Sequence, residues 1–181
     1  MNEKQIIDIS RFLSLILRHK PETIGIKLDK NGWADVEELI EKVNKQKQNL
    51  DIDILKHIVD TNSKKRFIFS SDLKKIRANQ GHSINVDLGL KIEVPPFILY
   101  HGTSDDNFDS IMKNGLEKRN RQHVHLSKDI DTAVNVGRRH GKVIVFEVSA
   151  RKMHTDGFKF FLSENGVWLT DNVPSKYLIK K

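Results

Sequence analysis

The sequence predicts an α+β protein in which a small helical lobe with a β-hairpin precedes a second lobe of short strands and helices. Three amphipathic segments fill the first third of the chain, with apolar residues at helical spacing. An apolar, aromatic-rich run at 66–70 follows them and indicates a strand. After Pro95-Pro96 the pattern changes to short apolar runs separated by polar turns, which is typical of a compact α+β lobe.

The first helix is predicted over 5–19, where apolar side chains form one stripe. Pro21 ends it, because proline lacks a backbone N–H and clashes with the preceding turn. Asn31-Gly32 predicts a turn, and Asp35 with Glu38 three residues later has the pattern of a capping box that starts a second helix. The stripe of the first helix consists of Ile6, Ile9, Phe12, Leu13, Ile16 and Leu17.

A third helix is predicted over 52–60, after a polar loop at 45–49. Strands at 66–70 and 75–78, joined by a Ser-Ser-Asp turn, would then form a hairpin. Three helices followed by a hairpin is the outline of a winged helix, a common nucleic-acid-binding module. The same outline also occurs in lobes that bind nothing, so it leaves both readings open.

The second lobe is predicted to hold a mixed or antiparallel sheet with two helices, 106–114 and 129–138. Gly115 is a typical residue at which the first of these helices would end. The predicted strands are Phe97-Ile98-Leu99-Tyr100, Val124-His125-Leu126, Val143-Ile144-Val145-Phe146-Glu147-Val148 and Gly166-Val167-Trp168-Leu169.

The composition of the 181-residue chain restricts its chemistry. The absence of cysteine excludes disulfides, thiolate nucleophiles and cysteine-ligated metals, and fits a cytoplasmic protein. No apolar run is long enough to span a bilayer, and the first residues do not form the apolar core of a signal peptide. The net charge of +7 favours an anionic partner such as nucleic acid.

Three clusters carry residue types that suit catalysis or binding. His101-Gly102-Thr103 is predicted where a strand gives way to a loop, so that a glycine lets backbone amides approach a ligand; a turn glycine beside a buried histidine is the other interpretation. Alternation in 121–127 would place Arg121, His123 and His125 on one strand face, which is also what an exposed face looks like. The basic run 136–141 is either functional or a cationic helix end.

Together these clusters resemble the RNA 2′-phosphotransferase family over nearly the whole chain. Each string is short, but eight occur in the family's order. They are Leu13-Ser14-Leu15-Ile16-Leu17-Arg18-His19-Lys20-Pro21, Asp29-Lys30-Asn31-Gly32-Trp33, Lys65-Arg66-Phe67, Ile76-Arg77-Ala78-Asn79-Gln80-Gly81-His82-Ser83, Leu99-Tyr100-His101-Gly102-Thr103, His123-Val124-His125-Leu126-Ser127, Val136-Gly137-Arg138-Arg139-His140-Gly141 and Asn165-Gly166-Val167-Trp168-Leu169-Thr170.

The resemblance implies a winged-helix RNA-binding lobe at 1–85 and an NAD-binding lobe of the ADP-ribosyltransferase fold at 94–181, with the active site between them. It further implies a cytoplasmic, monomeric transferase that acts on RNA with an internal 2′-phosphate, such as the tRNA-like products of tRNA splicing. NAD⁺ is consumed as a co-substrate and no metal is needed. The RNA 2′-phosphate would first displace nicotinamide, giving ADP-ribosylated RNA. The ribose 2″-hydroxyl would then attack phosphorus, releasing 2′-hydroxyl RNA and ADP-ribose 1″,2″-cyclic phosphate.

The resemblance also implies roles for individual residues. Arg18, His19, Arg66 and Arg121 match the family's catalytic set, with Arg138 and Arg139 as rivals for the last position. Residues expected to bind NAD⁺ are His101, Gly102, Thr103, His125, Ser127 and Arg139. Residues expected to contact the substrate are Arg77, Gln80, Gly81, His82 and Ser83.

This chemistry suits arginine. A phosphate monoester is already anionic near neutral pH, so the first step needs positioning more than a general base. Neither Glu147 nor Glu164, the nearest counterparts of the glutamate that many ADP-ribosyltransferases use, is therefore expected to be essential. Guanidinium groups meet phosphate oxygens with paired hydrogen bonds, and His19 is expected either to contact the same phosphate or to handle a proton.

Two other functions remain open from the residues alone. A winged-helix nucleic-acid-binding protein without catalysis would explain the first lobe and the charge, but not His101-Gly102-Thr103 or the 123–127 string. An ADP-ribosyltransferase acting on terminal phosphates of nucleic acid would stop after the first step. Release of nicotinamide distinguishes the first alternative, and a stable ADP-ribosylated nucleic acid would mark the second.

Overall fold

The computed structural model describes residues 2–62 and 64–181, apart from the side chain of His140, and it divides into two compact units, Met1–Gly89 and Leu90–Lys181. Each unit has its own cluster of buried apolar side chains, as expected of parts that each form a core. No helix in the described part of the chain is long and apolar enough to cross a membrane.

Unit 1 contains the three predicted helices, α1 (Glu3–Arg18), α2 (Val36–Asn44) and α3 (Ile52–Thr61). They form because their apolar stripes face one core, so that tertiary burial stabilises helices that would be marginal alone. The helices contribute Ile9, Leu13, Ile16, Leu17, Val36, Leu39, Val43, Leu55 and Ile58 to that core.

The helix ends follow local capping chemistry. Asn2 and Gln5 form a reciprocal capping box at the start of α1, and a 3₁₀ turn, η1 (Pro21–Ile24), follows the end of α1. Asp35 caps α2 as predicted, accepting a 2.9 Å hydrogen bond from the backbone N–H of Glu38. The Glu38 carboxylate instead pairs with Lys42 at 2.6 Å, so the cap of α2 is one-sided.

The predicted hairpin of unit 1 is confirmed as β2 (Phe67–Phe69) and β3 (Lys75–Ala78), in antiparallel register with Phe67 opposite Ala78. A strand that the sequence did not predict, β1 (Ala34–Asp35), pairs with the other edge of β3, which gives the order β1-β3-β2. Its two residues are too few for a period-2 pattern to be visible in the sequence.

Unit 2 combines several small antiparallel sheets with short helices, which confirms the α+β class. The central sheet has the order β11-β7-β4, formed by β4 (Leu99–Ser104), β7 (Val143–Val148) and β11 (Leu178–Lys180). A second has the order β6-β9-β8, formed by β6 (Val124–Leu126), β8 (Phe161–Leu162) and β9 (Trp168–Thr170). The third pairs β5 (Leu116–Glu117) with β10 (Asn172–Val173).

The helices of unit 2 are α4 (Phe108–Asn114), α5 (Ile130–Gly137) and α6 (Ala150–Thr155), of which α6 was not predicted. The 3₁₀ turn η2 (Asp105–Asn107) precedes α4, η3 (Arg138–His140) follows α5, and η4 (Ser175–Tyr177) precedes β11. Helix α4 ends at Gly115 as predicted, with that residue at φ +80°.

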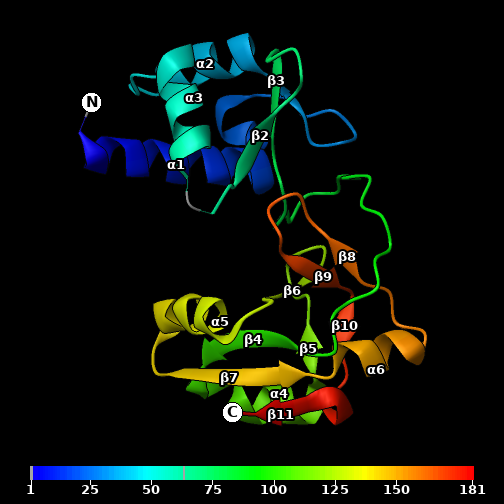
Figure 1. Ribbon diagram of the computed structural model, residues 1–181. Helices are drawn as coiled ribbons and strands as arrows, with labels where there is room; N and C mark the ends of the chain where they lie inside the picture. The colour runs from blue at the N-terminus through cyan, green and yellow to red at the C-terminus, as the bar shows by residue number, and fades with distance from the viewer. Residues whose placement is uncertain (1, 63) are drawn as a thin grey trace. The chain divides into compact units, whose positions relative to one another are not determined.

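One prediction at the centre of unit 2 is wrong. His101-Gly102-Thr103 does not lie in a loop after a strand; all three residues lie inside β4, paired with Phe146, Val145 and Ile144 of β7. The strand continues through the glycine because α5 packs directly on it (Figure 1). A Cβ built on Gly102 would lie 1.7 Å from the backbone oxygen of Ala133, so only glycine allows this approach.

Candidate functional site

The end of α1 gathers several of the predicted site residues of unit 1. Arg18 is the last residue of the helix, and its Nη2 donates a 3.4 Å hydrogen bond to the backbone oxygen of Arg66. His19 is the C-cap, and its Nδ1 lies 3.0 Å from the hydroxyl of Ser83. Arg18, His19, Arg66, His82 and Ser83 are called the α1-end cluster from here on.

The segment 80–83 completes this cluster by folding back on α1. The backbone N–H of Ser83 donates a 3.0 Å hydrogen bond to the carbonyl oxygen of Arg18. Gly81 has φ +89°, and a Cβ there would lie 3.6 Å from Nη1 of Arg18, so the backbone lies against the guanidinium. The segment therefore belongs to unit 1.

His82 is the buried member of the cluster, with 1% of its surface exposed. Neither ring nitrogen has a hydrogen-bond partner, and a Cβ built on Gly32 would lie 3.6 Å from Nε2. Burial lowers the pKa of His82 to about 4, and the nearby charges of Arg18, His19 and Arg77 add to the effect. At neutral pH His82 is therefore an uncharged imidazole surrounded by cationic side chains.

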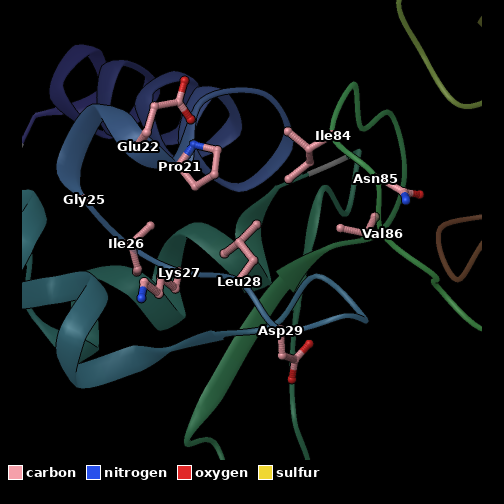
Figure 2. A pocket seen from close by; sticks show the side chains of 10 residues that line it. All are labelled: Pro21, Glu22, Gly25, Ile26, Lys27, Leu28, Asp29, Ile84, Asn85 and Val86. Carbon is pink, nitrogen blue, oxygen red and sulfur yellow. The ribbon is translucent and has the colours of Figure 1, made fainter.

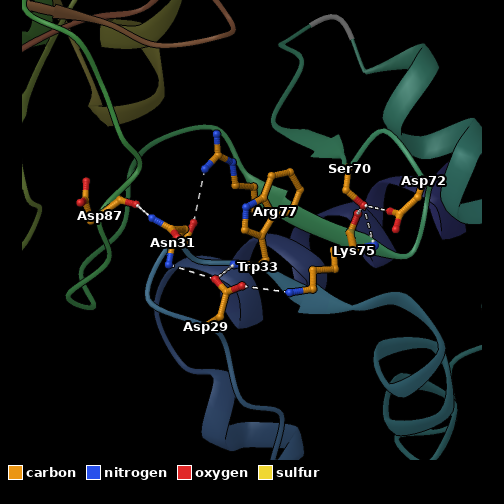
Figure 3. Close-up of polar contacts among 8 residues, drawn as sticks. All are labelled: Asp29, Asn31, Trp33, Ser70, Asp72, Lys75, Arg77 and Asp87. Carbon is orange, nitrogen blue, oxygen red and sulfur yellow. Dashed lines mark hydrogen bonds and ion pairs between the residues drawn. The ribbon is translucent and has the colours of Figure 1, made fainter.

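Arg77, the other predicted substrate contact, lies on β3 beside the Asn31-Gly32 turn (Figure 3). Its guanidinium stacks on the ring of Trp33 at 4.5 Å from the centroid, and Nη1 donates a 3.5 Å hydrogen bond to the carbonyl of Asn31. The Asn31 amide in turn donates to the carbonyl of Asp87 at 2.7 Å. These contacts fix the turn between the hairpin and the segment that follows His82.

A shallow hollow of about 480 Å³ lies beside this region, between η1 and residues 84–86 (Figure 2). Its walls include the apolar side chains of Ile26, Leu28 and Val86. Its charged residues carry both signs and lie on one stretch of chain: Glu22, Lys27 and Asp29. None of the predicted site residues lines it. The hollow therefore does not mark the chemistry that the sequence predicts.

In unit 2, His101 of β4 is held by the neighbouring strand β6. Its Nδ1 lies 3.0 Å from the carbonyl oxygen of His125, which can only accept, so Nδ1 carries the proton and Nε2 is left as an acceptor. Burial lowers the pKa of His101, and the nearby guanidinium groups of Arg121 and Arg119 lower it further. His101 is thus neutral in one defined tautomer, with its proton on Nδ1, and two arginines lie close by.

Thr103, two residues along the same strand, begins a hydrogen-bonded chain. The side-chain amide of Asn107 donates to Thr103 Oγ1 at 3.1 Å, and its carbonyl oxygen accepts from Arg119 Nη2 at 3.3 Å. Sequence reasoning missed Asn107 and Arg119. Arg119 adopts φ +50°, which is rare for arginine, but no sequence pattern identifies such a position.

The remaining predicted site residues of unit 2 lie in different elements. Ser127 pairs with Tyr100 through two backbone hydrogen bonds of 2.8 and 2.9 Å, which joins β4 to the end of β6. Arg139 is exposed in η3, two residues after Gly137. Gly137 packs closely on β4, because a Cβ built on it would lie 2.9 Å from the backbone nitrogen of Thr103. Arg138 is also exposed in η3.

The predicted strand face at 121–127 is only partly correct. Strand β6 spans Val124–Leu126, so Arg121 and His123 lie in the bend before it and strand alternation does not apply to them. Arg121 is exposed, whereas the ring of His123 packs against Phe161 at 5.6 Å between centroids. Burial lowers the pKa of His123, so its position indicates packing as much as binding.

The two glutamates considered from the sequence lie in ordinary structural positions. Glu147, on β7, forms an ion pair with Lys181 at 2.9 Å. Glu164 is exposed in the turn between β8 and β9. Within the described residues, no three histidine, aspartate or glutamate side chains are grouped closely enough to hold a metal ion.

Comparison with known proteins shows the family to which the chain is similar. Residues 4–172 match the model of the family described as RNA 2′-phosphotransferase, Tpt1 / KptA family. A protein of Fusobacterium nucleatum named "Probable RNA 2'-phosphotransferase" is 58% identical over 173 residues, covering 95% of this chain and 97% of its own. A protein of the same name from Flavobacterium johnsoniae is 57% identical over 178 residues, 98% of each chain, and one from Acaryochloris marina is 51% identical with the same coverage.

Proposed function

This chain belongs to the RNA 2′-phosphotransferase family, and on that premise we propose how its two units divide the reaction. The chain is an RNA 2′-phosphotransferase, an enzyme that removes a 2′-phosphate from RNA in a reaction that depends on NAD⁺. We propose that its RNA substrate is tRNA-like and that each unit has its own fold and its own substrate.

Unit 1 is proposed to be a winged-helix RNA-binding lobe over residues 1–85. Its order of elements supports this: a helix, a short strand, two helices and a β-hairpin, with the strand added to the hairpin's edge. Unit 2 is proposed to be an NAD-binding lobe of the ADP-ribosyltransferase type over residues 94–181. The support is its set of small antiparallel sheets, which place His101, Thr103 and Ser127 on or beside one strand.

Arg18, His19, Arg66 and Arg121 are proposed to act on the RNA 2′-phosphate. The observation that carries this proposal is the α1-end cluster, in which Arg18 donates a 3.4 Å hydrogen bond to the backbone oxygen of Arg66 and the next residue, His19, contacts Ser83 at 3.0 Å. Burial lowers the pKa of Arg66, which is the mark of a cation that gains by contact with an anion. Arg121 is included in this set because it precedes the 123–127 string and is exposed.

Charge stabilisation is the main task of this cluster. In the first step the 2′-phosphate is already anionic, so Arg18 and Arg66 would orient it rather than activate it. In the second step, negative charge on the non-bridging oxygens would be stabilised by the same guanidinium groups. His19, held by Ser83 through Nδ1, would present its other ring nitrogen to the phosphate or to the proton that leaves the attacking hydroxyl.

NAD⁺ is proposed to bind at His101, Gly102, Thr103, His125, Ser127 and Arg139. The donor set fits a dinucleotide: the uncharged His101 ring with a free Nε2 suits a ribose hydroxyl, and the cationic Arg119 nearby suits a pyrophosphate. Asn107, which links Thr103 to Arg119, would fix both groups. When bound, NAD⁺ supplies the acceptor carbon and the leaving nicotinamide.

Arg77, Gln80, Gly81, His82 and Ser83 are proposed to contact or support the RNA substrate. Ser83 acts through His19, and Gly81 allows close approach to Arg18. His82, buried and neutral, is proposed to fill the space behind the cluster without adding a further positive charge. Arg77 is held against Trp33, which supports a role in the surface beside the cluster.

The test is to incubate the protein with a short RNA that carries one internal 2′-phosphate, with and without NAD⁺, and to follow the RNA by mass. The proposal predicts NAD⁺-dependent loss of one phosphate and appearance of ADP-ribose 1″,2″-cyclic phosphate. A persistent gain in RNA mass would mean that the enzyme stops after ADP-ribosylation. No change of mass would contradict the proposed reaction altogether.

A further inference from the structure

A second hollow of unit 1, of about 670 Å³, lies between α1, the end of α3 and Arg66. Besides the apolar side chains of Ile6, Ile7 and Ile58 and the carboxylate of Glu3, its wall holds polar and cationic side chains that the sequence reasoning did not use, among them Ser10, Arg11, His57 and Asn62. Arg66, already proposed to contact the 2′-phosphate, forms part of its wall. Arg66 therefore belongs both to this hollow and to the α1-end cluster.

The positive charge of Arg66 is not balanced by an ion pair within the described residues. Its Nη1 donates a 3.3 Å hydrogen bond to the side-chain oxygen of Asn62, and no carboxylate in the described part of the chain forms an ion pair with it. Burial lowers the pKa of Arg66, and the positive charge of Arg11 lowers it further. A half-buried guanidinium beside a second guanidinium is stabilised by an anion that bridges or neutralises the two.

Asn62 fixes the side of this hollow formed by α3. Its side-chain oxygen also accepts from the backbone N–H of Lys64 at 3.1 Å, and its amide nitrogen lies 3.3 Å from the hydroxyl of Ser10 on α1. The end of α3 is thus tied to α1 at the position next to Arg11. Arg66 and Arg11 consequently lie beside a part of the surface that is held by hydrogen bonds.

Arg11 is free to take a new anionic partner at little cost. Its ion pair is with Asp8, one turn earlier on α1, at 3.6 Å, and both side chains are largely exposed, 78% and 54% respectively. Such an exposed pair contributes little to stability and is readily exchanged. Arg11 and Arg18 are two turns apart on the same face of α1, about 10 Å along the axis, a spacing that two long side chains can adapt to neighbouring phosphates of one strand.

We propose that Arg11 forms a second phosphate subsite, which binds a backbone phosphodiester of the RNA close to the nucleotide that carries the 2′-phosphate. The subsite rests on the proposed function, because it takes Arg18 and Arg66 as the site of the 2′-phosphate. It would distinguish an internal 2′-phosphate, which has charged neighbours on its strand, from an isolated nucleoside phosphate. Arg11 is a binding residue and takes no part in the chemical steps.

The test is a double-mutant cycle in which one cation of the protein and the charge of one phosphodiester are removed, separately and together. Short RNAs with one internal 2′-phosphate are made with each neighbouring phosphodiester replaced in turn by an uncharged methylphosphonate. Dissociation constants are measured by fluorescence anisotropy for the wild type, Arg11→Ala and the matched control Lys45→Ala. Lys45, like Arg11, is an exposed cation in an ion pair with a carboxylate on its own helical segment, here Glu41.

The proposal predicts that Arg11→Ala weakens binding of the fully charged RNA about tenfold, a typical effect of losing one phosphate contact. With the methylphosphonate at one particular position, the same substitution should have no further effect, whereas Lys45→Ala should have the same small effect on every RNA. An equal loss on all RNAs would show a general charge effect and overturn the subsite, as would no loss at all. Because binding is measured without turnover, these outcomes are distinct from a failure of the proposed reaction, which appears in the mass of the product.

Discussion

The side chain of His19 lies 3.0 Å from Ser83, 64 residues further along the chain, through Nδ1 of the ring and the serine hydroxyl. This contact sets the orientation of a histidine that the family resemblance places in the catalytic set. It also joins the end of α1 to the segment 80–83, which the backbone bond from Ser83 to Arg18 holds in place. We propose from this relationship that Ser83 is a positioning residue, whose side chain can be removed while Arg18 and Arg66 stay in place.

Ser83→Ala should therefore slow the reaction about fivefold, the effect expected from loss of one hydrogen bond worth about 1 kcal/mol. The measurement is the single-turnover rate with an RNA that carries one internal 2′-phosphate. Ser83→Thr keeps the hydroxyl and should recover most of the rate, which separates orientation of His19 from a general effect on folding. A wild-type rate in Ser83→Ala would show that the contact does not position the ring.

His82→Gln should flatten the pH dependence of stability. Because the pKa of His82 is about 4 in the folded protein and 6.5 as its ordinary value, the unfolded chain binds a proton between these pH values that the folded chain does not. The free energy of unfolding of the wild type should then fall by about 3 kcal/mol as pH drops from about 6.5 to about 4, with no contribution from this group above pH 6.5.

The check is urea unfolding of the wild type and His82→Gln at several pH values. Glutamine does not titrate, so the variant should lack this part of the decline, whatever its stability at neutral pH. Arg18, His19 and Arg77 surround the ring in the folded protein and are unchanged in the variant. Parallel declines in the two proteins would mean that His82 is not held neutral by its surroundings.

The sequence predicted the elements of unit 1 well but missed parts of its sheet. Helices α1 to α3 were predictable because each carries a long apolar stripe, and the hairpin because its strands are short and continuous. Strand β1, with the two residues Ala34–Asp35, has no periodicity to detect and exists only through its pairing with β3. Its formation is a tertiary effect.

The candidate site residues stay a prediction, and their surroundings could not be predicted from the sequence. The family strings name Arg18, His19 and Arg66; in the structure Arg18 donates to the backbone oxygen of Arg66, and His19 contacts Ser83. Local propensity ended β4 before His101 because glycine is unfavourable in a strand, whereas the contact of Gly102 with α5 requires it there. Asn107 was missed because its role depends on two partners at different distances along the chain.

Gly102→Ala should destabilise unit 2 by several kcal/mol, because the added methyl group would meet the backbone oxygen of Ala133 at 1.7 Å and backbone cannot yield as a side chain can. Gly157→Ala is the control. That residue has φ +97° but nothing within 4 Å of a built Cβ, so its cost should be limited to backbone strain of about 1 to 2 kcal/mol. Thermal unfolding measures both, and equal losses would contradict the packing argument.

Asn107→Ala should raise the KM for NAD⁺ about five- to tenfold and leave the affinity for RNA unchanged. The substitution breaks both hydrogen bonds that connect Thr103 with Arg119, each worth about 1 kcal/mol. Asn114→Ala, at the exposed end of α4, is the matched control and should have little effect. A change in RNA affinity, or none in the KM for NAD⁺, would place this hydrogen-bonded chain outside the NAD⁺ site.

The most direct test of the account is the single-turnover rate of RNA dephosphorylation by Arg66→Ala at saturating NAD⁺. The account predicts a loss of about 100- to 1,000-fold, the typical effect of removing one preorganised charge from a transition state, while Arg66→Lys recovers part of the rate and thermal unfolding shows a folded protein. A folded Arg66→Ala enzyme that removes the 2′-phosphate at the wild-type rate would contradict the claim that the α1-end cluster holds it.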